Sequence, residues 1–160
     1  KDSAIHKSTL AGISSSMPAL MEAYKISSRA ANVGFDWPNI AGLFDKLSEE
    51  IAELKKELER CPAPGPEPHA TGVAGSSGKQ IPDELRTRLE DEVGDLLFVL
   101  VNIARYLSLD PESALRQTNR KFKRRFQYVE EQILRSGKIM PDASLGEMET
   151  LWQESKRNEK

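Results

Sequence analysis

The chain has 160 residues, of which 38% are hydrophobic and 30% charged, and its formal net charge is −2. This length suits one domain with a single buried core, and the composition is typical of a soluble, helix-rich protein. The small net charge creates no field that would attract nucleic acid or an anionic membrane surface. The longest apolar run, Leu96 to Val101, is too short to span a bilayer, so we expect neither partner.

The single cysteine, Cys61, excludes an intrachain disulfide and a cysteine metal cage, which fits a reducing cytoplasm. No basic-then-apolar leader opens the sequence, so we expect no secretion signal and a cytoplasmic location. The first residue is Lys1 rather than methionine, which is compatible with a fragment of a longer protein.

Helical periodicity begins after a serine-rich lead-in, residues 1–15, which we expect to be loosely ordered. A first helix is predicted from Pro18 to Asn32, with Ser16 as its cap. A second helix is predicted over residues 39–60. Its narrow apolar stripe consists of Leu43, Leu47, Ile51, Leu54 and Leu58.

The segment 61–82 interrupts this pattern with closely spaced prolines and glycines. Such a segment cannot hold a helix and has little apolar surface to bury. We interpret it as a mobile loop that joins two helices of one domain spanning residues 16–160. A linker between two domains is the weaker alternative, because neither flank has a core of its own.

The third helix is predicted over residues 83–107. It is apolar on all sides from Leu96 to Val101, which indicates burial on several faces. In a bundle of this size, such burial suggests that a partner subunit covers part of the helix.

Two more helices complete the predicted fold. Asp110 and Pro111 begin the fourth helix, which continues to Arg135. Ser144 and Glu147 form a capping box for the last helix. Because no strand pattern longer than a few residues is present, the sequence predicts an all-α bundle of about five helices.

Acidic side chains border the apolar stripes of the second and third helices. Glu50 and Glu53 flank the stripe of the second helix, one turn apart, and Asp95 flanks that of the third. Glu92 falls inside the face that should be buried, where a carboxylate is costly unless it is paired or binds a metal. A divalent cation would also remove the repulsion among these acids. An all-oxygen ligand set indicates Mg²⁺ or Mn²⁺ and disfavours zinc.

This pattern resembles the EExxE and ExxD signature of the MazG family, the all-α nucleoside triphosphate pyrophosphohydrolases. Here the signature is Glu49-Glu50-x-x-Glu53 followed by Glu92-x-x-Asp95. Further MazG-like segments are VGFDWPNI (33–40), DEVGDLLFVLVNIARYL (91–107), NRKFKRRFQYVEE (119–131) and SLGEMETLW (144–152). The resemblance runs from Leu10 to Lys156 and is closer to the second, catalytic domain of tandem MazG proteins. The segment between Glu53 and Glu92 is longer than the family usually has, which puts features such as substrate access in doubt.

The resemblance implies Mg²⁺-dependent hydrolysis of nucleoside triphosphates to the monophosphate and pyrophosphate. It also implies broad base specificity, as in housecleaning of the nucleotide pool, and a homodimer that shares helices across its interface. The implied Mg²⁺ ligands, with Mn²⁺ as a substitute ion, are Glu50, Glu53, Glu92 and Asp95. Glu49 would either orient the attacking water or hold a further ion.

Cationic and aromatic residues would bind the nucleotide. Lys121 and Arg125 lie on one flank of the fourth helix, one turn apart, and match the family's basic segment. Lys46 and Arg88 each precede acidic groups by one turn. The full implied set is Lys46, Arg88, Lys121, Arg124, Arg125 and Trp152. A solvated basic face and a core tryptophan are the alternatives.

Two other functions stay open at this point. A dUTP- or dCTP-selective pyrophosphatase of the same superfamily would share the fold and the acids. A non-catalytic helical interaction module would carry the acids of the second helix on a solvated face, paired with Lys55 and Lys56. A di-iron carboxylate bundle would need Glu-x-x-His pairs, which the sequence lacks.

Overall fold

The computed structural model describes residues 8–60 and 82–159, and the regular secondary structure in this part of the chain is helical. The helices are α1 (Ala19–Asn32), α2 (Ile40–Glu59), α3 (Asp83–Tyr106), α4 (Pro111–Arg135) and α5 (Leu145–Asn158), with a short 3-10 helix, η1 (Met140–Asp142), before α5. The predicted all-α class is confirmed. The predicted loop lies outside the described residues except for Pro82, and so do Cys61 and the first seven residues of the lead-in.

Local capping signals set most of the helix ends. The Asn39 side chain accepts a hydrogen bond from the Gly42 backbone N–H at 3.0 Å and so caps α2. The capping box predicted at the start of α5 is present. The predicted Ser16 cap of α1 is wrong, because Pro18 holds the capping position and no side chain caps this helix. Ser16 Oγ instead lies 2.7 Å from Ser14 Oγ.

The described residues form two compact units, divided within α4 after Ala114. The first unit contains α1, α2, α3 and the start of α4, and the second contains the rest of α4 with η1 and α5. The proposal of a single domain over residues 16–160 stays a prediction.

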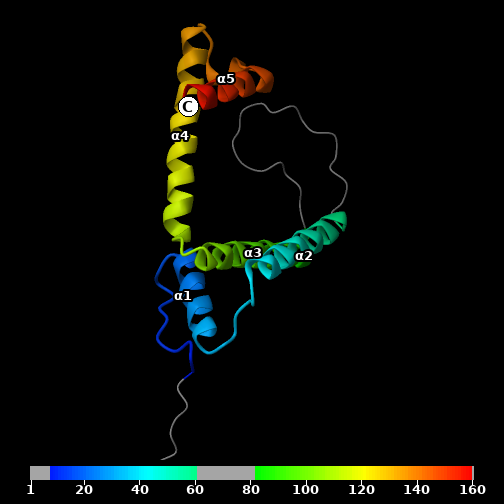
Figure 1. Cartoon of the computed structure of the whole chain (residues 1–160). Helices are drawn as coiled ribbons and strands as arrows, with labels where there is room; N and C mark the ends of the chain where they lie inside the picture. Colours follow the sequence, from blue (N-terminus) through cyan, green and yellow to red (C-terminus); the bar gives the residue numbers. More distant parts are fainter. Residues whose placement is uncertain (1–7, 61–81, 160) are drawn as a thin grey trace, which may run out of the picture. The chain divides into compact units, whose positions relative to one another are not determined.

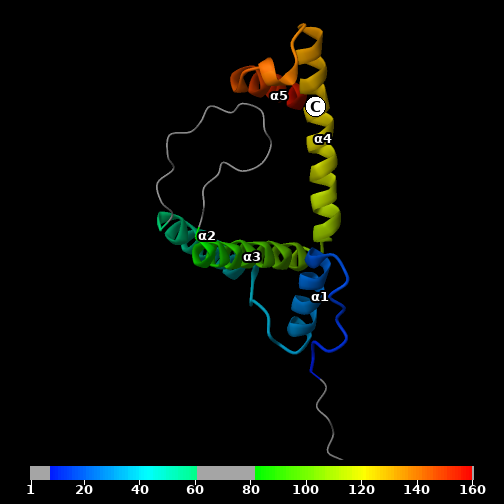
Figure 2. The same ribbon diagram turned by 180° about the vertical axis from the view of Figure 1, so that it is seen from behind.

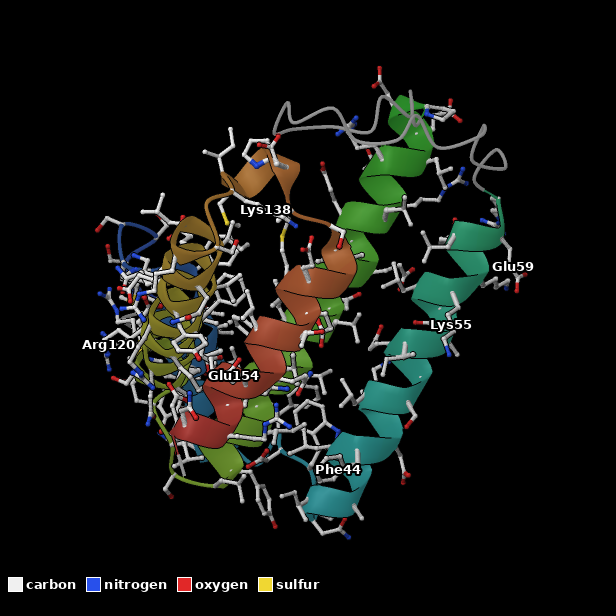
Figure 3. The ribbon with its side chains drawn as sticks, turned by 90° about the horizontal axis from the view of Figure 1, so that it is seen from above. Phe44, Lys55, Glu59, Arg120, Lys138 and Glu154 are labelled. Atoms are coloured by element: carbon white, nitrogen blue, oxygen red, sulfur yellow. The ribbon has the colours of Figure 1, made fainter. Side chains whose placement is uncertain are left out.

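In the first unit, α2 and α3 pack side by side and run antiparallel (Figures 1 and 3). The buried apolar residues of these two helices are Leu43 of α2 and Leu85, Val99 and Val101 of α3. Helix α1 packs against α3, as both the front and the back view show (Figures 1 and 2). This antiparallel pair is what brings acids from distant parts of the sequence together.

An ion pair fixes the turn between α1 and α2 to the end of α3. Arg105 binds Asp36 through both terminal nitrogens, with 3.1 Å between Nη1 and Oδ2. Its Nε donates to the fully buried Asn102 at 3.3 Å, and Asn102 donates to the Phe98 carbonyl at 3.0 Å. This network holds the start of α2 in place relative to α3.

In the second unit, α5 packs on the C-terminal half of α4 (Figure 1). Val129 and Ile133 of α4 are buried, and the Phe122 and Trp152 rings lie 5.0 Å apart between centroids. Lys138 and Glu147 form an ion pair where the chain turns between the two helices.

The outer face of α3 carries apolar side chains that the other described residues of the first unit leave partly exposed. Val99 and Val101 are buried, whereas Val93, Leu97 and Leu100 keep 45%, 48% and 49% of their surface exposed. Burial of this stretch on several faces is thus partial among the described residues, and its cover by a partner subunit stays a prediction. Among the described residues, no helix is long and apolar enough to cross a membrane.

Candidate metal centre

Three acids from α2 and α3 converge within the first unit. Glu50, Glu92 and Asp95 each offer one carboxylate oxygen, and these oxygens lie within 4.8 Å of one another. Glu50 is 3% exposed, Glu92 is half-buried and Asp95 is exposed. Three of the four predicted ligands thus form one compact group, hereafter the acidic triad.

The acidic triad has the properties expected of a cation site. Glu50 Oε2 and Glu92 Oε2 are buried and have no hydrogen-bond partner among the described residues. Burial, and then the charges of Glu50 and Asp95, raise the pKa of Glu92. A hard divalent ion would satisfy both oxygens and cancel the repulsion, and the all-oxygen donor set suits Mg²⁺ or Mn²⁺. The residues present therefore fit the implied metal.

Glu53, the fourth predicted ligand, lies beside the triad rather than within it. Its side chain is exposed, and it does not belong to the 4.8 Å group. Its pKa is nevertheless raised, first by loss of surrounding water and then by the closeness of Glu50 and Glu92. Glu53 is thus close enough, on the next turn of α2, for the charges of the triad to raise its pKa.

Lys46 and Glu49 form a charged group at one end of the triad. Lys46 Nζ lies 2.6 Å from Glu50 Oε1 and 3.0 Å from Glu49 Oε1. These two carboxylates raise the pKa of Lys46, so its ammonium stays charged at neutral pH. Lys46 therefore pairs with Oε1 of Glu50, whereas Oε2 has no hydrogen-bond partner among the described residues.

Glu57, which was not among the predicted site residues, lies at the end of the triad opposite Lys46. It is 9% exposed, and it pairs with Arg60 on its own helix and with the predicted phosphate contact Arg88 on α3. Its charge also contributes to the raised pKa of Glu92. The signal was present in the sequence, because Glu57 follows Glu50 by seven residues and so shares its helix face.

The predicted cations of α4 belong to the second unit. Arg124 Nε and Arg125 Nη2 each lie 2.7 Å from a different carboxylate oxygen of Glu159. The Arg125 guanidinium carbon stands 5.9 Å from the centroid of the Trp152 ring. Arg124 and Arg125 thus share the Glu159 carboxylate and Arg125 lies over Trp152, while Lys121 is exposed.

A sequence model of the MazG nucleotide pyrophosphohydrolase domain matches residues 40–130, which is more than half of the chain. The chain belongs to the MazG family. The matched range contains the acidic triad and the predicted phosphate contacts Lys46, Arg88 and Lys121, whereas Trp152 lies beyond it.

MazG-family relatives extend the likeness over most of the chain. The nucleoside triphosphate pyrophosphohydrolase of Escherichia coli (strain K12) is 40% identical over 152 residues, covering 95% of this chain and 50% of that protein. The nucleoside triphosphate pyrophosphohydrolase/pyrophosphatase MazG of Thermotoga maritima is 36% identical over 140 residues, covering 88% and 45%. The uncharacterized protein YabN of Bacillus subtilis is 49% identical over 72 residues, covering 45% and 15%. This MazG-family chain therefore spans about half the length of the first two relatives.

Proposed function

We propose that this chain hydrolyses nucleoside triphosphates to the monophosphate and pyrophosphate with the help of Mg²⁺. The proposal is carried by one observation: the buried Glu50 meets Glu92 and Asp95 with two buried oxygens left unpaired. Family membership supports it, since two relatives are named for this activity.

The acidic triad would hold the cation, with Glu53 joining it from the next turn of α2. Mg²⁺ is the proposed ion because all the donors are carboxylate oxygens, and Mn²⁺ is the proposed substitute. When bound, such an ion neutralises phosphate charge and makes the α-phosphorus a better electrophile.

The other residues would bind the substrate and place the water. A water molecule adds to the α-phosphorus, the bond from that phosphorus to the bridging oxygen breaks, and pyrophosphate leaves. Lys46 and Arg88 would contact phosphate oxygens from α2 and α3. Glu49, held by Lys46, would orient the water or hold a further ion.

Residues of α4 and α5 are further candidate contacts for a nucleotide. Lys121, Arg124 and Arg125 are proposed phosphate contacts, and Trp152 is a proposed stacking partner for the base. A flat aromatic surface accepts any base, which fits the proposed broad specificity and a housecleaning role in the cytoplasm. We propose no nucleic-acid or membrane partner.

The proposed assembly is a homodimer. The half-exposed side chains of Val93, Leu97 and Leu100 lie on the outer face of α3, and a groove of about 370 Å³ lined by Val93 and Leu97 runs along it. A second copy would bury this apolar surface, and such burial is the main driving force of association.

Product analysis with an α-³²P-labelled triphosphate tests the reaction. We expect label in the monophosphate and an equal amount of unlabelled pyrophosphate, with turnover only when Mg²⁺ is added. Labelled diphosphate with inorganic phosphate, or no turnover, would overturn the proposal. A panel of eight ribo- and deoxynucleotides tests the breadth, and strong preference for dUTP or dCTP alone would replace it with the pyrimidine-selective alternative.

A further inference from the structure

Glu57 is a buried carboxylate that the proposed chemistry leaves without a role. It lies on α2 two turns beyond Glu50, at the end of the triad opposite Lys46. It is 9% exposed, so almost all of its hydration is lost on folding. A buried carboxylate needs a partner of opposite charge, and the identity of that partner indicates its use.

The two oxygens of Glu57 have unequal partners. Oε1 accepts a hydrogen bond from Arg60 Nη1 at 2.6 Å. Oε2 is buried and has no hydrogen bond among the described residues, and Arg88 Nε stands 3.4 Å from it as an ion pair. The Glu57 carboxylate is therefore shared between Arg60 and Arg88, and its pairing with Arg88 joins α2 to α3.

Arg88 is half-exposed and stands one turn before Glu92 on α3. Within the described part of the chain, its ion-pair contact uses Nε. The two Nη groups of a guanidinium can bind two phosphate oxygens at once. The closest approach of Glu57 to Arg88 is thus at Nε, and no described residue accepts a hydrogen bond from the two Nη groups.

We propose that Glu57 is a positioning residue, which holds Arg88 by Nε so that its Nη groups grip the phosphates of a nucleoside triphosphate bound at the acidic triad. This inference rests on the proposed function and deepens it. Glu57, Arg60 and Arg88 together carry one net positive charge, so the group attracts a polyphosphate in spite of its buried anion.

The antiparallel helix pair gives this arrangement its geometry. Lys46 precedes Glu50 by one turn on α2, and Arg88 precedes Glu92 by one turn on α3. The helices run in opposite directions (Figure 3). One turn towards the N-terminus therefore leads to opposite ends of the triad on the two helices, which places the two cations at opposite ends. A triphosphate lying across the triad is then contacted at both ends, and each cation is held by a carboxylate of α2.

A double-mutant cycle on Glu57 and Arg88 tests the inference. The variants are Glu57→Gln, Arg88→Gln and the double variant, with Glu59→Gln as the matched control. Figure 3 shows Glu59 on the side of α2 that faces away from α3. Steady-state KM and kcat are measured, together with the affinity for an α,β-methylene triphosphate analogue in Mg²⁺, which needs no turnover.

We expect Glu57→Gln to raise KM and weaken analogue binding roughly five- to tenfold, with kcat changed less than about twofold. When Arg88→Gln is already present, adding Glu57→Gln should weaken analogue binding hardly any further, because a positioning residue acts only through its partner. Arg88→Lys replaces the guanidinium with an ammonium, which has no fork, and keeps Glu57 unchanged. We expect it to weaken analogue binding about as much as Glu57→Gln does. Glu59→Gln should match the wild type.

Additive effects of the two substitutions would overturn the inference, and so would unchanged analogue binding in Glu57→Gln or a tenfold effect of Glu59→Gln. If the wild type binds the analogue and the cycle is non-additive, but no pyrophosphate is released, the positioning role stands and the proposed function fails. Thermal unfolding curves of each variant separate a lost fold from a lost contact.

Discussion

Glu92 shows how a single residue of the triad is destabilised without a cation. Its buried Oε2 has no hydrogen-bond partner among the described residues, and the charges of Glu50 and Asp95 repel it. A carboxylate whose pKa is raised by folding costs stability at any pH at which it is ionised. The metal-free protein should therefore be less stable at neutral pH than its packing alone would allow.

The repulsion of the Glu92 charge leads to a prediction for this residue. In a chelating buffer at pH 7, Glu92→Gln should raise the thermal unfolding midpoint, because the amide keeps the shape of the side chain and loses the repelled charge. Glu90→Gln, on an exposed position of the same helix, should leave the midpoint within about 1 °C. Differential scanning fluorimetry measures both, and a lower midpoint for Glu92→Gln alone would contradict the repulsion.

Particular residues also show how far the sequence predicts the site. Helical periodicity placed Glu50, Glu92 and Asp95 on facing sides of two helices, and the structure brings them together. Periodicity fixes the face of a residue but not its rotamer, which is why Glu53 lies beside the triad instead of in it. Glu57 was missed because the family motif ends at Glu53, although the spacing of seven continued the same face.

At the scale of the element, helix ends were predictable because capping is a local interaction. The Ser144–Glu147 box lies where its spacing predicts it, and Asn39, predicted as the first residue of the second helix, proves to be its cap. Ser16 does not cap α1, because Pro18, two residues later, holds the capping position. Burial of α3 was predicted only in part, since a pattern of apolar residues does not say which chain covers them.

The capping box of α5 carries the element-scale prediction. The Lys138 ammonium, followed by the backbone and side chain of Ser144, holds the pKa of Glu147 at about 2, below its usual 4.5. Ionised Glu147 thus stabilises the helix above pH 4.5, and this contribution is lost as the pH falls through about 2. Glu147→Gln should unfold at a lower temperature than the wild type at pH 7. The difference in unfolding temperature between the two proteins should narrow steadily below pH 4.5. A difference that stays constant would contradict a stabilising role of ionised Glu147.

At the scale of the whole molecule, the described residues form two units, with the triad in the first and the α4 cations in the second. Each unit is held by its own contacts: the triad by α2 against α3, and the arginine pair by Glu159 and Trp152. Amphipathic patterns report which face a helix buries, while the packing of units and subunits depends on shape that no local pattern encodes.

The apolar outer face of α3 gives the whole-molecule prediction. Leu97→Glu should convert the proposed dimer to a monomer, because a charge would replace a half-exposed side chain at the centre of that face. Light scattering after size-exclusion chromatography measures the mass. Leu134→Glu, at a 70% exposed position of α4, is the control and should remain dimeric. A dimer in both variants would place the interface elsewhere.

Cation binding by the acidic triad tests the central claim most directly. Mn²⁺ titrated into chelator-treated protein, with the free ion followed by electron paramagnetic resonance, gives the affinity without any substrate. We expect saturable binding by the wild type and by Glu90→Gln, and affinity reduced at least tenfold to a hundredfold in Glu50→Gln and Glu92→Gln, on the order of the losses seen at metal sites. Equal binding by all four proteins would show that these carboxylates hold no cation, and the account built on them would fail.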